Sequence, residues 1–367
     1  MTFNIPCLFG LEGLVADELR RLGMPSVRPD NGHVAFDGSE LDLARANIHI
    51  ATGERVLLLI GETAANTFDE LFEGVRRMPW AQFIPRDGAF PVAGYARNSK
   101  LHSIPDCQKI IKKSVAATLG AAYGLTTLPE TAATYQIRFS IVDDRASLYL
   151  DTSGAGLHKR GYRPQSVAAP LRETLAAAMV KLARYRGRET FRDPFCGSGT
   201  IPIEAALAAK NRAVGLNRRF AAEQWATLDA KIWTEARDDA RAREYNGTYN
   251  IVGGDIDPES IKIARENAAR AGVSDCVRFE VADAREFGNN ADTSGVIVTN
   301  PPYGERVMER DDAAKLYREF GASVRSLKDW KLYILSSHTE FEREFGRVAN
   351  KKRKLYNGMI KCDLYMY

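Results

Sequence analysis

The chain of 367 residues contains few cysteines, and their placement excludes two kinds of protein. The five cysteines are scattered, no two stand at the spacing of metal ligands, and an odd, dispersed set argues against a disulfide framework. We therefore predict no metal site. Cys196 has no histidine near it in sequence to activate it, so a loop-packing role is favoured over a nucleophilic one.

Long apolar runs are also missing. No run approaches the length of a membrane span, and the N-terminus has neither the basic region nor the long apolar segment of a signal peptide. We expect no contact with a membrane and a cytoplasmic location. The net charge of +4 gives only weak support for an anionic partner. A chain of this length has room for two or three domains, each with its own core.

Helix and strand signals alternate in the first part of the chain. Residues 11–22 carry apolar side chains at helical spacing and residues 33–36 form a short strand pattern, which predicts a small α+β domain over residues 1–55. Residues 56–155 show the same alternation of helix and strand patterns and include a strongly amphipathic helix over residues 106–119. The two segments predict two consecutive α+β domains.

A basic connector with several Gly and Pro residues follows over residues 156–170 and is the best candidate for a domain boundary. Residues 171–367 then alternate helix and strand and end in a hairpin with an Asn-Gly turn. This succession predicts a mostly parallel, doubly wound α/β sheet with an antiparallel edge. Residues 211–248 interrupt it as an insertion, expected to be helical, for which the sequence indicates no role.

The most informative motif is Asn-Pro-Pro-Tyr at residues 300–303, which closes an apolar run. Neither proline has an N–H, and each keeps the residue before it out of the helical region, so the carbonyls of Asn300 and Pro301 stay free to accept. The Asn300 amide oxygen and the flat ring of Tyr303 complete a set that suits a planar molecule with an exocyclic amine. A chance Pro-Pro turn closing a strand is the alternative. The candidate catalytic residues are Asn300, Pro301, Pro302 and Tyr303.

Three further motifs stand where strands of the predicted sheet end, which is where a doubly wound sheet binds its ligand. Gly197 lies in a Gly-x-Gly turn that lets a ligand approach the backbone, and Thr200 begins a helix whose free N–H groups suit a carboxylate. Asp255 and Asp283 each follow a strand. Taken singly these signals are weak, because Gly-x-Gly is common and a strand-end Asp often caps the next helix.

A nicotinamide-dependent dehydrogenase is the rival enzyme class. Its Gly-x-Gly-x-x-Gly motif, counted from Gly197, would need a glycine where this chain has Pro202. The Asn-Pro-Pro-Tyr motif would also have no purpose in hydride transfer, so this reading is disfavoured.

In their order along the chain, the segments 191–200, 252–258, 279–284 and 300–303 resemble the motifs of class I methyltransferases that use S-adenosylmethionine. The Asn-Pro-Pro-Tyr form resembles that of enzymes that methylate an exocyclic base amine. The resemblance implies that Asp193 lies near the amino group of the methionine moiety, that Asp255 holds the ribose and that Asp283 holds the adenine. The implied cofactor-binding residues are Asp193, Phe195, Cys196, Gly197, Ser198, Gly199, Thr200, Asp255, Ile256, Asp283, Ala284 and Asn300.

The resemblance extends over essentially the whole chain. Residues 101–115 are similar to the central helix of THUMP domains, which are RNA-binding modules, and residues 157–163 look like the junction in bacterial THUMP-containing methyltransferases. The likeness is greatest to the ribosomal RNA large subunit methyltransferases of the K/L group, which make N2-methylguanosine in 23S RNA. It implies a ferredoxin-like domain, a THUMP domain and a Rossmann-like methyltransferase domain, in that order.

The expected function is S-adenosylmethionine-dependent methylation of an exocyclic base amine, with guanine N2 of 23S ribosomal RNA favoured. The alternatives left open are a tRNA guanine-N2 methyltransferase, an adenine-N6 methyltransferase, and a non-catalytic RNA-binding or ribosome assembly protein. The expected partner is ribosomal RNA or the assembling large subunit rather than tRNA, and the oligomeric state stays open.

Basic side chains form clusters in the second domain and in the connector. A solvated surface is the default interpretation of each cluster, but clusters that flank one base pocket favour a phosphate track. The predicted RNA-binding residues are Arg97, Lys100, Lys109, Lys112, Lys113, Lys159, Arg160 and Arg163.

Overall fold

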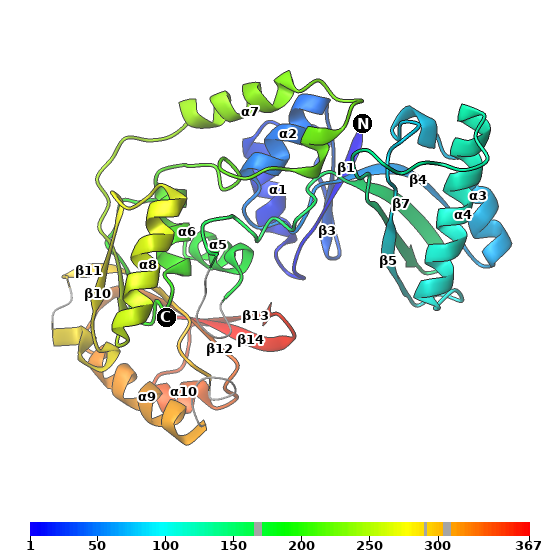
Figure 1. The fold of residues 1–367 in the computed structure, drawn as a ribbon. Helices are drawn as coiled ribbons and strands as arrows, with labels where there is room; N and C mark the ends of the chain where they lie inside the picture. The colour runs from blue at the N-terminus through cyan, green and yellow to red at the C-terminus, as the bar shows by residue number, and fades with distance from the viewer. Residues whose placement is uncertain (165–170, 290–291, 304–309) are drawn as a thin grey trace.

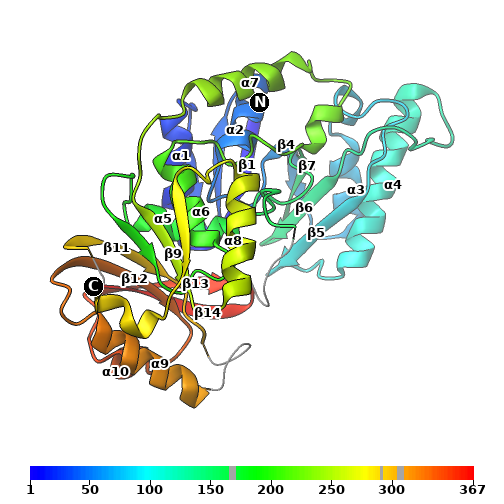
Figure 2. The ribbon, with the colours of Figure 1, turned by 60° about the vertical axis from the view of Figure 1, so that its left-hand side comes forward.

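The computed structural model describes residues 1–164, 171–289, 292–303 and 310–367, and the described part is organised around two seven-stranded sheets (Figure 1). One sheet belongs to the N-terminal part of the chain and the other to the C-terminal part. The two sheets lie side by side, and helix α7 (Lys231–Ala242) lies at the top of both views, next to α2 (Glu40–His49) of the N-terminal part (Figure 2).

The first sheet has the strand order β2-β3-β1-β4-β7-β6-β5. Because β1 pairs with β4, with Phe3 opposite Leu58, residues 1–55 and 56–155 contribute to one continuous sheet. The sequence motifs gave no sign of this pairing. The strands are β1 (Thr2–Pro6), β2 (Arg28–Asp30), β3 (His33–Asp37), β4 (Leu57–Ala64), β5 (Val92–Arg97), β6 (Ile137–Val142) and β7 (Arg145–Asp151).

Local sequence explains where these helices and turns begin and end. The Thr67 side chain accepts a hydrogen bond from the Glu70 N–H and so starts α3. Gly124, with φ of +65°, ends α4 in the left-handed conformation. Asp143 and Asp144 both have positive φ and make the tight turn between β6 and β7. The helices are α1 (Glu12–Arg21), α2 (Glu40–His49), α3 (Phe68–Arg76) and α4 (Ile104–Tyr123), with a 3-10 turn at Trp80–Gln82.

The second sheet confirms the predicted doubly wound class. Its strand order is β10-β9-β8-β11-β12-β14-β13, in which the five strands from β10 to β12 are parallel to one another and β14 runs antiparallel to both of its neighbours, β12 and β13. The chain order reverses between β8 and β11, which are neighbours in space. The strands are β8 (Phe191–Asp193), β9 (Ile251–Asp255), β10 (Val277–Val281), β11 (Ser294–Thr299), β12 (Asp329–Ser336), β13 (Lys351–Asn357) and β14 (Ile360–Met366).

Helices pack on both faces of this second sheet (Figure 1). Along β11, Val296 and Val298 are buried on the side of α5, α6 and α8, whereas Ile297 is buried on the side of α9 and α10. This alternation is why the strand is apolar throughout. The helices are α5 (Glu173–Leu182), α6 (Thr200–Ala209), α8 (Pro258–Ala271), α9 (Arg310–Ser323) and α10 (Phe341–Phe345), with 3-10 turns at Ala221–Gln224 and Ala284–Asn289.

The insertion over residues 211–248 packs against the N-terminal part of the molecule. Its helix α7 contacts α2, and Trp225 stacks on Tyr135 with the ring centroids 4.9 Å apart. The Trp225 Nε1–H also donates to the Thr134 carbonyl at 3.0 Å. Gly215 passes so close to Ile48 that a Cβ added there would stand 2.8 Å from the Ile48 Cα. The insertion, which the sequence left without a role, therefore fixes the two sheets to each other.

In the described part of the chain, no helix combines the length and the apolar character that crossing a membrane requires.

Candidate active site

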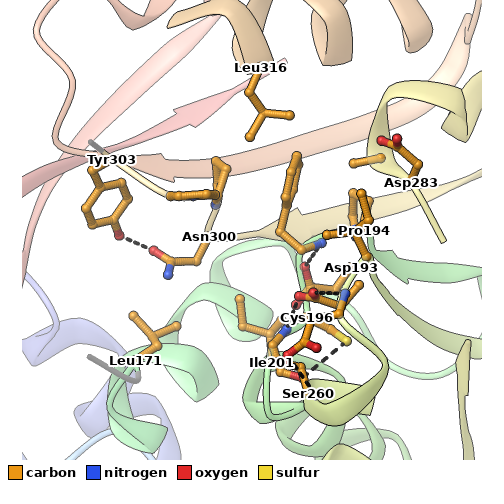
Figure 3. Close-up of a pocket in the computed structure, with 18 of the residues that line it drawn as sticks. Leu171, Asp193, Pro194, Cys196, Ile201, Ser260, Asp283, Asn300, Tyr303 and Leu316 are labelled. Carbon is orange, nitrogen blue, oxygen red and sulfur yellow. Dashed lines mark hydrogen bonds between the residues drawn. The ribbon is translucent and has the colours of Figure 1, made fainter. Parts of the chain in front are cut away.

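The carboxyl ends of β8 and β11 open into a cavity of about 710 Å³. These strands mark the point where the strand order reverses, which is where a doubly wound sheet binds its ligand. Figure 3 shows Asp193, Cys196 and Ile201 on one side of the cavity and Asn300 and Tyr303 on the other. The predicted residues that line it are Asp193, Phe195, Cys196, Gly197, Ser198, Thr200, Asp255, Ile256, Asp283, Ala284, Asn300, Pro301, Pro302 and Tyr303.

A buried hydrogen bond joins the two halves of this cavity. The Thr299 hydroxyl, at the end of β11, donates to Asp193 Oδ1 at 2.6 Å, at the end of β8. The Phe195 N–H donates to the same oxygen at 3.2 Å. Burial raises the pKa of Asp193 to about 7, and the nearby Asp255 carboxylate adds to the effect. Asp193 is therefore a carboxyl group poised to gain or lose a proton near neutral pH.

The glycine-rich turn after β8 needs glycine for two reasons. Gly197 and Gly199 have φ of 50° and 84°, in the left-handed region, and a Cβ at Gly199 would stand 2.9 Å from the Ala264 Cβ. Gly199, which was also predicted, is not among the residues that line the cavity; it supplies the N-cap of α6 without a side-chain hydrogen bond. The first N–H groups of α6 thus remain for an anionic group such as a carboxylate.

Asp255, at the end of β9, supports this turn and still has acceptor sites to spare. Its Oδ2 accepts from the Gly197 N–H at 2.9 Å, and its Oδ1 accepts from the Asp257 N–H at 3.0 Å. An ionised carboxylate has about four acceptor sites, so a vicinal diol can still be bound. Asp257 itself caps α8, accepting from the Glu259 and Ser260 N–H groups.

Asp283 is engaged by a neighbour that the sequence motifs did not reveal. The Arg285 guanidinium donates to both carboxylate oxygens, with Nε at 2.9 Å from each, and lowers the pKa of Asp283. An adenine edge would therefore share this carboxylate with Arg285. Ile256 borders the same part of the cavity and is 63% exposed, which suits a side chain that covers an aromatic ring.

The Asn-Pro-Pro-Tyr segment is held by two tyrosines. The Tyr303 hydroxyl donates to Asn300 Oδ1 (Figure 3), and the Tyr317 hydroxyl donates to the Pro302 carbonyl at 2.6 Å. Tyr303 is half-buried against the core, and burial raises its pKa. The contact with Asn300 orients the amide oxygen, and stacking of a base on Tyr303 stays a prediction.

Cys196 is buried, and burial raises the pKa of its thiol well above the ordinary value. A thiol held neutral is a poor nucleophile, which fits the packing role that the sequence favours.

Several lining residues were missed by sequence reasoning. They come from α9, from the β13–β14 hairpin and from the segments that flank the motifs, so their approach to the cavity depends on how distant elements cross. The terminal hairpin was visible in the sequence, but its turn residues are Gly358 and Met359 rather than the predicted Asn357 and Gly358, and its position beside the cavity was not visible. The missed residues are Leu171, Pro194, Ile201, Asp257, Ser260, Ala282, Arg285, Asp312, Lys315, Leu316, Glu319, Asn357 and Ile360.

Arg160 does not form part of an RNA-binding surface, and its prediction is wrong. Its side chain is buried, donates to the Ala51 carbonyl at 2.6 Å and forms an ion pair with Glu204 at 3.4 Å. A buried guanidinium has to be paired within the protein, so this arginine links the connector to the N-terminal part and to α6.

Two further predicted RNA contacts are also engaged inside the protein. Arg163 donates to Thr200 Oγ1 at 2.8 Å and pairs with Glu173, so it supports the start of α6. The Lys112 ammonium pairs with Glu130 at 2.6 Å. These contacts leave neither side chain free to lead an RNA contact. The predicted cations that remain exposed are Arg97, Lys100, Lys109, Lys113 and Lys159.

Across the described ranges, no group of three or more His, Cys, Asp or Glu side chains is arranged to hold a metal ion.

Known domain families match nearly all of the chain. The RMKL-like methyltransferase domain matches residues 160–366, the RlmL ferredoxin-like domain residues 2–57, and the THUMP domain residues 65–151. The chain belongs to the RMKL-like methyltransferases. It is an S-adenosylmethionine-dependent RNA methyltransferase with the ferredoxin-like, THUMP and Rossmann-like order that the sequence predicts.

Relatives of this RMKL-like methyltransferase fall into two lengths. YpsC of Bacillus subtilis (strain 168) is 44% identical over 98% of this chain and 93% of that protein. A protein of Syntrophotalea carbinolica named ribosomal RNA large subunit methyltransferase K/L is 34% identical over 97% of this chain. The chain spans about half the length of that K/L relative, 52%.

Solved structures share the whole architecture of the RMKL-like methyltransferase. SMU.472, crystallised with S-adenosylhomocysteine (SAH), has a TM-score of 0.93 and 38% identity, covering 100% of this chain and 97% of that one. A protein of Listeria monocytogenes, named a predicted N6-adenine-specific DNA methylase, has a TM-score of 0.94 and 43% identity, covering 100% of this chain and 95% of that one.

Proposed function

We propose that this RMKL-like methyltransferase transfers the methyl group of S-adenosylmethionine to N2 of a guanine in ribosomal RNA of the large subunit. The main observation in support is that the glycine-rich turn and Asn300 line the same cavity. The strands that carry them are joined by the hydrogen bond from Thr299 to Asp193. The K/L relative is named for large-subunit ribosomal RNA, which supports this substrate over tRNA.

The cofactor fits the donors of the cavity, and when bound it supplies a methyl group activated by a positively charged sulfur. The N-terminus of α6 suits its carboxylate, and ionised Asp193 suits its ammonium group. Asp255 keeps acceptor sites for the ribose diol. Ile256 and the Asp283–Ala284 segment border the space left for adenine.

Asn300 would bind the nucleophile, which is the exocyclic amine of the target base. An exocyclic base amine is a poor nucleophile because its lone pair is delocalised into the ring. Hydrogen bonds from its two hydrogens to Asn300 Oδ1 and the Pro301 carbonyl favour a pyramidal nitrogen with a directed lone pair. The Tyr303 hydroxyl uses one acceptor site of Asn300 Oδ1 and leaves the second for the amine. The chain contributes alignment and electrostatics, and no strong base is needed because the proton can leave after transfer.

Exposed cations of the N-terminal part offer phosphate contacts to the RNA. Lys109 and Lys113 project from α4, and Arg97 lies on the edge strand β5. The target base has to leave its stack to reach Asn300, and the adjacent Tyr303 ring offers a surface on which it can stack.

Replacement of Asn300 tests the proposal. The N300A variant is expected to lose at least 100-fold in methyl transfer to large-subunit RNA from a deletion strain, while its affinity for S-adenosylmethionine stays within severalfold. Transfer is measured with labelled cofactor, and cofactor affinity by calorimetry. Asn350 is exposed and lies outside the cavity, so N350A serves as the matched control and should keep full activity. Undiminished transfer by N300A would refute the assigned role.

The product identifies the base. Digestion of the labelled RNA to nucleosides should give N2-methylguanosine. Since Asn-Pro-Pro-Tyr suits either amine, N6-methyladenosine as the product would overturn the guanine assignment while leaving the role of Asn300 intact. Label that appears only in tRNA would overturn the choice of ribosomal RNA.

A further inference from the structure

The C-terminal hairpin places its tip beside the cavity. Asn357 and Ile360 are the last cross-strand pair of β13 and β14, and both line the cavity. Only Gly358 and Met359 connect them. Gly358 has φ of +65°, the left-handed conformation that a two-residue hairpin turn requires. The turn therefore holds Met359 at a fixed place on the rim.

Met359 is unusual for its exposure. Its side chain is 95% exposed, more than any other large hydrophobic residue in the described part of the chain. An unbranched apolar side chain on a tight turn gains nothing from water, and a methionine adapts its shape to an irregular apolar partner. A single exposed apolar residue is ordinary on a protein surface, so its position beside the cavity is what gives this one significance.

The hairpin below the tip is rigid. Leu355, Cys362 and Leu364 are buried in the core, and β14 pairs with β12 over residues 363–366. The Arg353 guanidinium also donates to the Gly10 carbonyl, which fixes the hairpin to the N-terminal part of the chain. The tip can therefore press against a partner without folding back.

The outer face of the hairpin carries charge that suits a nucleic acid. Tyr356 and Lys361 are paired across the strands and exposed, and Lys354 is exposed next to them. Asp363 lies opposite Lys354 and offsets part of this charge. Two cations and an aromatic ring directly behind an apolar tip suit phosphates and bases behind an inserted side chain. In both ribbon views the hairpin lies on the side of the methyltransferase domain that faces the first sheet (Figures 1 and 2).

We propose, on the basis of the function proposed above, that Met359 inserts into the RNA beside the target nucleotide and fills the space that its base vacates on entering the cavity. A base that leaves its stack loses the contact with its neighbours, and an apolar side chain in the gap restores part of that contact. The Asn357 and Ile360 side chains directly below the tip then face the extruded base. The partner is a segment of RNA whose bases are stacked before binding.

Cross-linking locates the tip on the RNA. With p-benzoylphenylalanine at position 359 and 23S ribosomal RNA transcribed in vitro as the probe, cross-links are expected within two nucleotides of the methylated guanosine. The same label at Val348, which is 78% exposed and precedes β13 at the opposite end of the hairpin, is the matched control and should not reach that site. Cross-links from position 359 no stronger than those from position 348 would overturn the proposal.

Kinetics show whether the apolar side chain matters. M359S is expected to lower kcat/KM for the transcript at least tenfold, M359L to retain it within threefold, and V348S to leave it within twofold. Because Met359 is exposed, M359S should fold normally and bind S-adenosylmethionine with unchanged affinity. Wild-type activity in M359S would refute the inserted methionine but not the proposed function, whereas a wild-type protein that transfers no methyl group to RNA would refute the proposed function itself.

Discussion

At the scale of single residues, Asp193 connects the chemistry of the cavity to the stability of the fold. It is buried, it accepts from Thr299 and the Phe195 N–H, and burial raises its pKa to about 7. A carboxyl whose folded pKa lies above its unfolded value binds more protons when folded. Its contribution to stability is therefore present at low pH and is lost as pH rises from about 4 to about 7.

The same carboxyl should make cofactor binding depend on pH. In the proposed binding mode the ammonium group of S-adenosylmethionine pairs with ionised Asp193, so below pH 7 binding would also remove a proton. We expect the affinity to rise up to about tenfold per pH unit between pH 5.5 and 7 and to level off above that range. Calorimetric titration at several pH values checks this slope.

Asp193→Asn supplies the control for that slope. The Asn side chain keeps an oxygen that can accept from Thr299 and Phe195, but it cannot ionise. D193N should bind the cofactor weakly at every pH and show no slope in this range. A slope as steep in D193N as in the wild type would assign the pH dependence to another group.

The functional residues at the strand ends could be predicted from the sequence, but the hydrogen bonds and ion pairs between side chains could not. Asn300 and Asp255 could be identified because a motif sits where a strand stops, and position along a doubly wound sheet follows from the order of elements. The bond from Tyr303 to Asn300 and the burial of Arg160 could not be read, since both depend on side chains brought together by the folded core. A basic connector looks the same in sequence whether its arginines face water or a buried Glu204.

At the scale of elements, periodicity located the helices predicted at residues 11–22 and 106–119 to within a few residues. Residues 106–119 were predicted as the amphipathic helix that the structure extends to Ile104–Tyr123, and its mostly apolar core face, in which Ser114 is the one polar member, explains the strong signal. The pairing of β1 with β4 had no such signal, because a pairing across some fifty residues is set by the whole sheet rather than by local pattern. The structure was also needed to separate the exposed lysines of α4, Lys109 and Lys113, from Lys112, which is paired with Glu130.

The exposed face of α4 gives a prediction at this scale. K109Q/K113Q should weaken RNA binding and reduce the dependence of log K on log salt by about 1.5, because each phosphate contact contributes about 0.7–0.9. Filter binding of the 23S transcript between 50 and 200 mM salt measures the slope. K262Q/K328Q removes two exposed lysines from the methyltransferase domain and serves as the control for net charge.

Lys112 should behave differently from its two neighbours. Its ammonium pairs with Glu130 and lies 3.7 Å from the centre of the Phe90 ring, so K112Q should lower the free energy of unfolding by about 1 kcal/mol or less and leave the salt slope nearly unchanged. An unchanged slope in K109Q/K113Q, or a slope reduced mainly by K112Q, would show that the RNA approaches another face.

At the scale of the whole molecule, the insertion turns two domains into one rigid frame. The THUMP domain implies RNA binding by the N-terminal part, whereas the cavity belongs to the second sheet, so a fixed distance between the two would help one bound RNA to reach the cavity. Trp225 and Trp233 of the insertion are buried with the core of the first sheet, although the insertion belongs in sequence to the methyltransferase domain. Composition alone could not assign this role, because a segment rich in Arg, Trp and Glu fits an exposed helix equally well.

Trp225→Ala tests whether this frame matters for function. The substitution removes the stack on Tyr135 and the bond to the Thr134 carbonyl, and loss of a buried tryptophan costs about 3–5 kcal/mol. We expect the N-terminal part to unfold in a separate, earlier thermal transition. Methyl transfer to the 23S transcript should fall at least tenfold, while affinity for S-adenosylmethionine stays within twofold, because the cavity at β8 and β11 does not include Trp225.

W225F retains a stacking ring and should restore most of the activity. A single thermal transition together with full RNA methylation in W225A would show that the two parts stay in place without the insertion, since the remaining contacts from Arg160 and Arg353 would then be sufficient.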